Sequence, residues 1–142
     1  MHILSRFVIA VSLLVALPVG AQAQPAERTV VDTVPLDPDG TVSVENHDGE
    51  INISAWNRSE VQYEARIVHE HQETVDDTRI KLDASADEVE IESNFDDVEK
   101  SGFWSSRSVP EVYYTLSVPT GASVEIEDHG SSIRIEGVQG EV

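Results

Sequence analysis

The fold is decided by a twelve-residue segment that reads Val42-Ser43-Val44-Glu45-Asn46-His47-Asp48-Gly49-Glu50-Ile51-Asn52-Ile53. The pattern returns near the C-terminus as Val124-Glu125-Ile126-Glu127-Asp128-His129-Gly130-Ser131-Ser132-Ile133-Arg134-Ile135. The two copies align without a gap at a constant offset of 82 residues. Each copy alternates apolar and polar residues on both sides of a short polar turn. This pattern predicts two half-buried strands that form a hairpin in each copy.

The remaining chain shows the same alternation between turn residues. Apolar side chains recur at every second position from Val61 to Ile67 and from Val112 to Val118, so each set would lie on one face of a strand. Beyond the repeat, strands are predicted over residues 29–34, 60–71, 79–84, 88–93 and 111–118. Residues 72–78 and 94–110 are predicted loops, the first with room for a short helical turn. No long segment shows a helical period, so the sequence predicts an all-β fold.

The N-terminus has the pattern of a secretory signal peptide. A short basic start is followed by an apolar run over residues 7–20 and by Ala21-Gln22-Ala23, a cleavage pattern of small residues. We therefore expect residues 1–23 to be removed and residues 24–142 to form one exported domain, in the periplasm, at the cell surface or outside the cell. The chain has no cysteine, so its stability cannot depend on disulfides.

The chain is strongly acidic, with 27 Asp and Glu against 9 Lys and Arg and a net charge of −18. Such a charge disfavours nucleic acid and anionic membrane surfaces as partners. It is compatible with cationic or basic partners, with salt adaptation, or with a simple solvated surface. No second apolar run of spanning length follows the signal segment, so we expect no membrane insertion after cleavage.

The glycine-punctuated motifs carry a resemblance to a known family. The pattern Val34-Pro35 … Gly40-x-Val42-x-Val44 … Gly49-x-Ile51-x-Ile53 returns as Val118-Pro119-Thr120-Gly121 … Val124-x-Ile126 … Ile133-x-Ile135-x-Gly137. It resembles exported bacterial proteins of unknown function that are grouped as "putative adhesins" or adhesin head domains. The resemblance covers most of residues 24–142 and implies a β-solenoid-like or rolled β-sheet of short strands. A β-sandwich is the alternative.

The resemblance also implies that further rungs, each one layer of the stacked strands, would follow. This chain reaches Val142 where another strand would begin. It is therefore expected to be a shortened member, a fragment, or a chain whose C-terminal edge is covered by a partner or by a second copy.

Histidines are the candidate metal ligands. His47 and His129 occupy the same place in the two copies, each beside an aspartate, and they could share a transition metal if the copies stack. The alternative is that histidine tolerates the turn and simply recurs with the repeat. His69 and His71 are two residues apart on a predicted strand, which is also a ligand spacing in some zinc sites. No third ligand with a defined spacing accompanies His69 and His71.

Three aromatic residues are the candidate binding residues. Trp56, Phe103 and Trp104 lie in or beside predicted turns, where such side chains often anchor a protein partner or stack on sugars. Trp104 could equally fold back over the core.

Motifs of the common catalytic centres are missing from the sequence, including a nucleophile elbow, a zinc-protease helix and a phosphate loop. The sequence therefore predicts a non-enzymatic binding module without a cofactor, whose partner is a protein or glycan of the cell envelope. Two alternatives stay open. One is a structural envelope protein that assembles edge to edge through its C-terminal rung, and the other is a periplasmic metal-binding or sensing protein.

Overall fold

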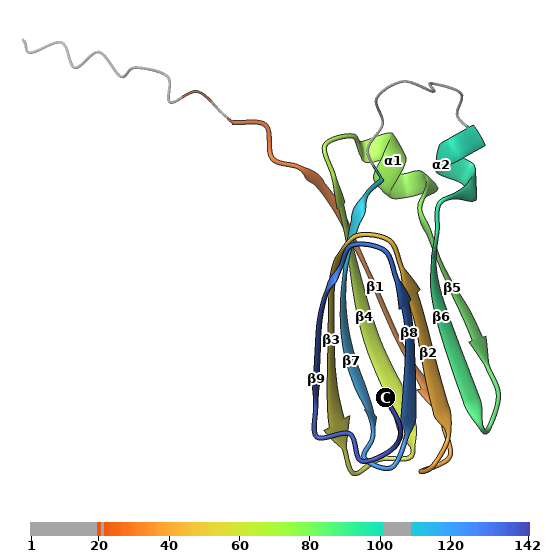
Figure 1. Cartoon of the computed structure of the whole chain (residues 1–142). Coiled ribbons are helices and arrows are strands. Elements are labelled where there is room, and N and C mark those ends of the chain that lie inside the picture. Colours follow the sequence, from red (N-terminus) through yellow and green to blue (C-terminus); the bar gives the residue numbers. More distant parts are fainter. Residues whose placement is uncertain (1–19, 21, 101–108) are drawn as a thin grey trace, which may run out of the picture.

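The computed structural model describes residue 20, residues 22–100 and residues 109–142, and it confirms an all-β chain with two short helices in this part (Figure 1). The predicted signal peptide lies almost wholly outside these residues. In chain order the elements are β1 (Ala26–Pro35), β2 (Thr41–Asn46), β3 (Gly49–Trp56), β4 (Glu60–His69), α1 (Gln72–Asp77), β5 (Arg79–Ala84), β6 (Glu88–Asn94), α2 (Asp96–Lys100), β7 (Glu111–Pro119), β8 (Ser123–Asp128) and β9 (Ser132–Glu136). No helix among the described residues has the length and apolar character needed to cross a membrane.

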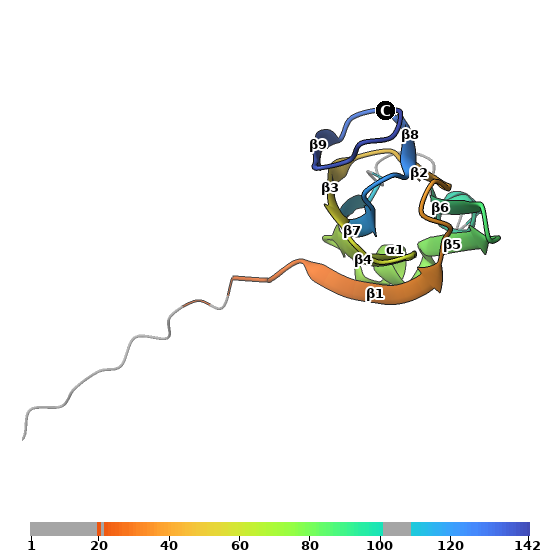
Figure 2. The same cartoon turned by 90° about the horizontal axis from the view of Figure 1, so that it is seen from below.

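The strands form two mixed sheets that face each other across one core (Figure 2). The five-stranded sheet has the order β1-β4-β7-β3-β9, and the four-stranded sheet has the order β5-β6-β2-β8. β3 runs parallel to both of its neighbours, and so does β2. The pairs β1–β4, β4–β7 and β5–β6 are antiparallel. Neither sheet closes on itself, so each has two edge strands.

The two copies of the repeat are arches and not the predicted hairpins. The strands of one copy belong to different sheets, and each pairs in parallel with its counterpart in the other copy. Val42 lies opposite Val124, and Ile51 lies opposite Ile133. The 82-residue offset of the sequence is therefore the register of both ladders. We call residues 41–56 the first arch and residues 123–136 the second arch.

The core is filled by alternating apolar side chains from both sheets, which confirms the inward faces predicted for β4 and β7. The side chains that are at most 2 % exposed include Val42, Val44, Ile51, Ile53, Val61, Tyr63, Ala65, Ile67, Val89, Ile91, Val112, Tyr114, Leu116, Val118 and Val124. The prediction was less accurate for β5: Ile80 and Leu82 are half-buried, and Ala84 is exposed. β5 is an edge strand, so the core covers it on one side only.

The predicted loops contain helices. Residues 72–77 form α1, and residues 96–100 inside the predicted loop 94–110 form α2, which begins with two aspartates that favour a helix N-terminus. β4 ends at His69, two residues earlier than predicted. β1 begins at Ala26, before the predicted start at residue 29. Arg28 anchors this part of the chain, because its Nη2 donates to the carbonyl oxygens of Val75 and Thr78 at the end of α1.

One buried hydrogen bond joins the two sheets through the core. The hydroxyl groups of Tyr114 on β7 and Ser93 on β6 lie 2.7 Å apart, and neither residue is more than 3 % exposed. Burial raises the pKa of Tyr114, because a phenolate would lose its hydration. The neutral hydroxyl is therefore the form that the fold stabilises.

We expect Tyr114→Phe to lower the free energy of unfolding by about 1–3 kcal/mol at neutral pH, since it leaves the Ser93 hydroxyl buried without its partner. The raised pKa also means that stability is lost as the pH rises above about 10, where the unfolded tyrosine ionises. This alkaline loss should be smaller in the variant. Urea unfolding at neutral and alkaline pH measures both effects. Tyr113→Phe is the control, because that hydroxyl bonds the exposed Glu111; equal losses for the two variants at neutral pH would contradict the prediction.

Candidate functional site

Trp56 contacts other residues of the turn that connects β3 and β4. Its Nε1 donates to the carbonyl oxygen of Glu60 at 2.8 Å, and the Arg58 guanidinium lies 4.8 Å from the centroid of its ring. The side chain is half-buried. Its polar atom and part of its ring are therefore already used within the chain.

Of the three predicted binding residues, the structure describes only Trp56. β3 ends at Trp56, at the end of the strands far from α1 and α2 (Figure 1). Phe103 and Trp104 follow α2 in the sequence and lie outside the described residues. Their role as binding residues stays a prediction.

His47 and His129 are brought together by the stacking of the two arches. Their ring centroids lie 4.7 Å apart with an interplanar angle of 82°. The ring of Phe95 also packs against His47, with 5.3 Å between the ring centroids. His47 is half-buried and His129 is exposed. The sequence argument for this pair depended on stacking, and the stacking is present.

The chemistry available to this histidine pair is limited by its neighbours. Asp48 Oδ1 accepts a hydrogen bond from the backbone N–H of Gly49, and Asp128 Oδ2 accepts one from the backbone N–H of Ser131. One oxygen of each carboxylate is therefore already bonded within the turn of its own arch. Within the described residues, no group of three or more His, Cys, Asp or Glu is arranged to hold a metal ion. The pair could supply two imidazole ligands, and water would have to supply the others.

The other histidine pair is arranged differently from the prediction. β4 ends at His69, and His71 is the residue before α1, so the two do not extend from one strand face. The backbone N–H of His71 donates to Nδ1 of His69 at 3.1 Å. This nitrogen is therefore engaged in the turn into the helix.

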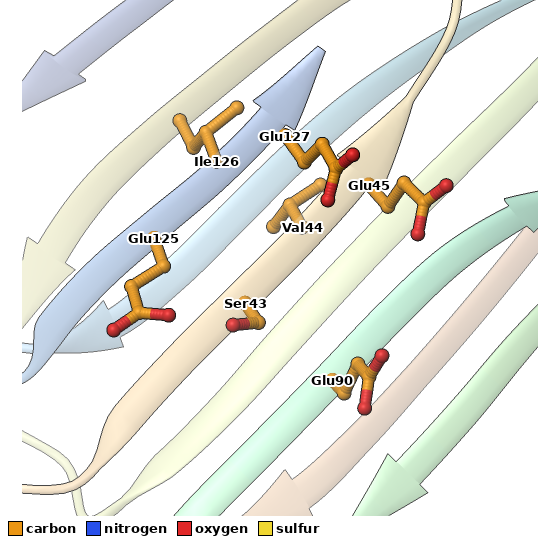
Figure 3. A pocket seen from close by; sticks show the side chains of 7 residues that line it. All are labelled: Ser43, Val44, Glu45, Glu90, Glu125, Ile126 and Glu127. Carbon is orange, nitrogen blue, oxygen red and sulfur yellow. The ribbon is translucent and has the colours of Figure 1, made fainter.

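Carboxylates form rows on the outer face of the four-stranded sheet (Figure 3). The parallel register places Glu92, Glu45 and Glu127 side by side on three successive strands, and Glu90, Ser43 and Glu125 in the row below. All of these residues except Glu92, together with Val44 and Ile126, line a shallow open depression. Lys81 on β5 pairs with Glu92 at 3.4 Å. The other carboxylates of these rows have like-charged neighbours, so the face attracts cationic groups.

These rows were not predicted from the sequence. The signal that could have found them is the identity of Glu45 and Glu127 at the 82-residue offset. Once the offset is taken as a strand register, the acidic residues of the two copies must lie side by side.

The second arch ends both sheets on the same side of the molecule (Figure 2). In the described part of the chain, β8 pairs only with β2, and β9 pairs only with β3. Ile133 on β9 is 47 % exposed, although Ile51 beside it on β3 is 0 % exposed. On β8 the N–H of Val124 donates to the carbonyl oxygen of Glu141 at 2.8 Å. Beyond Val124, the second arch presents open strand edges together with apolar side chains in the described part of the chain.

No protein-family model matches this sequence, and no curated protein sequence matches it either. Among solved structures, the fold is similar to that of a protein from Clostridium sporogenes ATCC 15579 described as a "putative cell adhesion protein". The two share 11 % sequence identity over 76 % of this chain, with a TM-score of 0.43. This chain spans about half of that protein, 51 % of its length. A similarity this distant carries no argument about function.

Proposed function

We propose that this chain is an exported, non-enzymatic binding module that resembles the adhesin family named above and attaches to a protein or glycan of the cell envelope. The observation that carries the proposal is the end of the scaffold at the second arch, where β9 and the part of β8 beyond Val124 pair on one side only in the described part of the chain and Ile133 is 47 % exposed. Surfaces of this kind mark sites of interaction between proteins. The signal-like segment at residues 1–23 supports export to the periplasm, the cell surface or the medium.

The scaffold suits this function because its two arches are stacked in register. In-register parallel stacking is the building rule of β-solenoids, and we propose that the arches are two successive rungs of a solenoid-like stack. Each rung buries its apolar side chains against its neighbour. A rigid scaffold loses little conformational freedom on binding, so more of the contact energy is available for affinity.

Binding of the labelled protein to the envelope fraction of the bacterium that produces it tests the proposal. We expect saturable binding that unlabelled protein displaces. If the aromatic residues predicted from the sequence are the contacts, Trp104→Ala should abolish attachment. Trp56→Ala should weaken it less, because that side chain is already engaged in its own turn. Attachment that never saturates, or that heat-denatured protein reproduces, would refute the binding module.

Assembly of the chain with itself is a second candidate function, favoured by the same open edges. A structural envelope protein would pair its second arch with that of another copy. Size-exclusion chromatography with light scattering, at low and high salt, detects such assembly. Salt is varied because a net charge of −18 opposes self-association and is screened beyond about 10 Å at 0.1 M salt. A defined oligomer or filament would favour assembly, and a folded monomer under both conditions would exclude it.

Metal binding is the third candidate, favoured by the 4.7 Å spacing of His47 and His129. If the pair binds Zn²⁺, the ion should stabilise the fold by about 2.7 kcal/mol at a free concentration 100 times the dissociation constant. The melting temperature should then rise by several degrees, and the rise should disappear in the double variant His47→Ala/His129→Ala. His71→Ala is the matched control and should retain the rise. An unchanged melting temperature at millimolar Zn²⁺ would remove this candidate.

A further inference from the structure

The open edge of the second arch is best defined by comparison with the first. Val44 is 1 % exposed and Ile51 is 0 % exposed, because the second arch covers that side of β2 and β3. At the same register positions in the second arch, Ile126 is half-buried and Ile133 is 47 % exposed. The compared side chains are similar and their backbones are in register. The difference in their exposed fractions therefore reflects the neighbouring strand that covers the first arch and that the second arch does not have in the described part of the chain. The position beyond β8 and β9 thus fits one more layer of strands.

The chain itself shows which kind of segment fits such a position. The second arch docks on the first through parallel ladders on both sheets, with apolar side chains directed inward at every second residue. The first part of the β8 edge is already occupied by the segment that follows the second arch: the N–H of Val124 donates to the carbonyl oxygen of Glu141 at 2.8 Å, and Gly140 lies against the backbone of Ala122 and Ser123. In the described part of the chain, the edge that is left for a further strand therefore begins at Glu125 on β8 and continues along β9. An extended segment with alternating apolar residues is therefore the shape that the edge can bind.

The charge of the outer face selects among such segments. A strand added beside β8 would place its outward side chains next to Glu125 and Glu127, at the end of the carboxylate rows (Figure 3). Neighbouring strands lie only about 4.8 Å apart, and like charges at that spacing destabilise a sheet. Lysine or arginine at these positions would instead be attracted. A second copy of this chain is the poorer occupant, because it carries the same net charge of −18.

We propose that the β8–β9 edge binds an extended segment of a basic partner protein, which adds a parallel strand beside β8 and continues through an arch to a strand beside β9. Its apolar side chains cover Ile126 and Ile133, and its outward Lys or Arg side chains face Glu125 and Glu127. This inference rests on the proposed binding function and names the surface and the partner chemistry. A glycan partner or a second copy would have to use other contacts or overcome the charge.

A synthetic peptide tests this directly on the full chain. The probe is a fluorescent copy of residues 123–136 in which Glu125 and Glu127 are replaced by lysine, and the unmodified acidic peptide is its matched control. We expect the basic peptide to bind at least about tenfold more tightly than the acidic one at low salt, and its affinity to fall with rising salt. Equal affinity for the two peptides, or no binding of either, would overturn the inference.

Two edge variants locate the binding. Ile133→Lys should weaken binding of the basic peptide at least about tenfold, because it places a charge at the centre of the edge. Val31→Lys is the control, since Val31 is 58 % exposed on β1, the opposite edge of the same sheet. Both side chains are exposed enough to be replaced without unfolding, which circular dichroism checks. Binding that survives Ile133→Lys, or that Val31→Lys weakens equally, would contradict the assigned edge.

Envelope binding separates this inference from the function on which it rests. If Ile133→Lys loses both the peptide and attachment to the envelope, both proposals hold. If it loses the peptide but still attaches, the partner uses another surface, and the edge inference fails while the binding module stands. If light scattering shows oligomers of the unmodified chain that Ile133→Lys dissolves, the occupant is a second copy and the proposed basic partner is wrong.

Discussion

Replacing Gly49 by alanine is expected to lower the free energy of unfolding by roughly 3 kcal/mol or more, through backbone strain together with overpacking. Gly49 begins β3 with a φ of 123°, which side chains rarely adopt. A Cβ at this position would lie 2.2 Å from the carbonyl oxygen of Val112 on β7, and also too close to its backbone nitrogen and carbon. Because the obstacle is backbone within a sheet, it cannot move aside as a side chain could.

The repeat offers a matched control for this substitution. Ser131 stands at the position of Gly49 in the second arch, and no residue other than glycine has a positive φ in the described part of the chain. Ser131→Ala removes a hydrogen bond of 3.0 Å from Asn46 Nδ2 and should cost about 1 kcal/mol. Urea unfolding of both variants compares the two costs. If Gly49→Ala were as mild as Ser131→Ala, the close contact between the first arch and β7 would not exist in solution.

Gly49 also shows where sequence reasoning stopped. The sequence placed this glycine in the polar turn, and the structure makes it the first residue of β3. The stronger reason for glycine is the backbone of Val112, which is 63 residues away in the sequence and is brought close by pairing of β3 with β7. A local pattern cannot identify a contact of that separation. The difference between Gly49 and Ser131 in the repeat was the available hint.

Strand positions were predicted well because apolar alternation depends on burial alone. Val61 to Ile67 and Val112 to Val118 lie inward as their period of two required. Strand partners were predicted less well. The repeat was assigned two hairpins where there are two arches. Both shapes place apolar residues at alternate positions around a polar turn, and only distant strands decide between them.

The candidate site residues also differed in how far the sequence could place them. His47 and His129 are paired because they share a register that the sequence repeat already contained. Trp56 was chosen for its residue type and its turn, and the structure shows its indole engaged by Glu60 and Arg58. The acidic rows were overlooked because carboxylates are so numerous in this sequence. Only the register distinguishes the few that line up from the many that do not.

The open edge leads to a second large effect, an asymmetry between two identical residues. Ile51→Ala should lower the free energy of unfolding by about 2–5 kcal/mol, because it removes a fully buried side chain and leaves a cavity between the sheets. Ile133→Ala, the same substitution in the neighbouring strand, should cost about 1 kcal/mol or less, because that side chain is already half in water. Both values come from urea unfolding at low protein concentration.

This comparison also tests the state of the edge in solution. Because the backbones of Ile51 and Ile133 are in register and the substitution is the same, local propensity largely cancels in the difference. A small cost at Ile133 means that nothing buries this side chain in the isolated protein, as an unoccupied binding edge at β9 requires. A cost equal to that at Ile51, growing with protein concentration, would mean that another copy buries Ile133. The open edge would then be an assembly interface, and stability itself would depend on association.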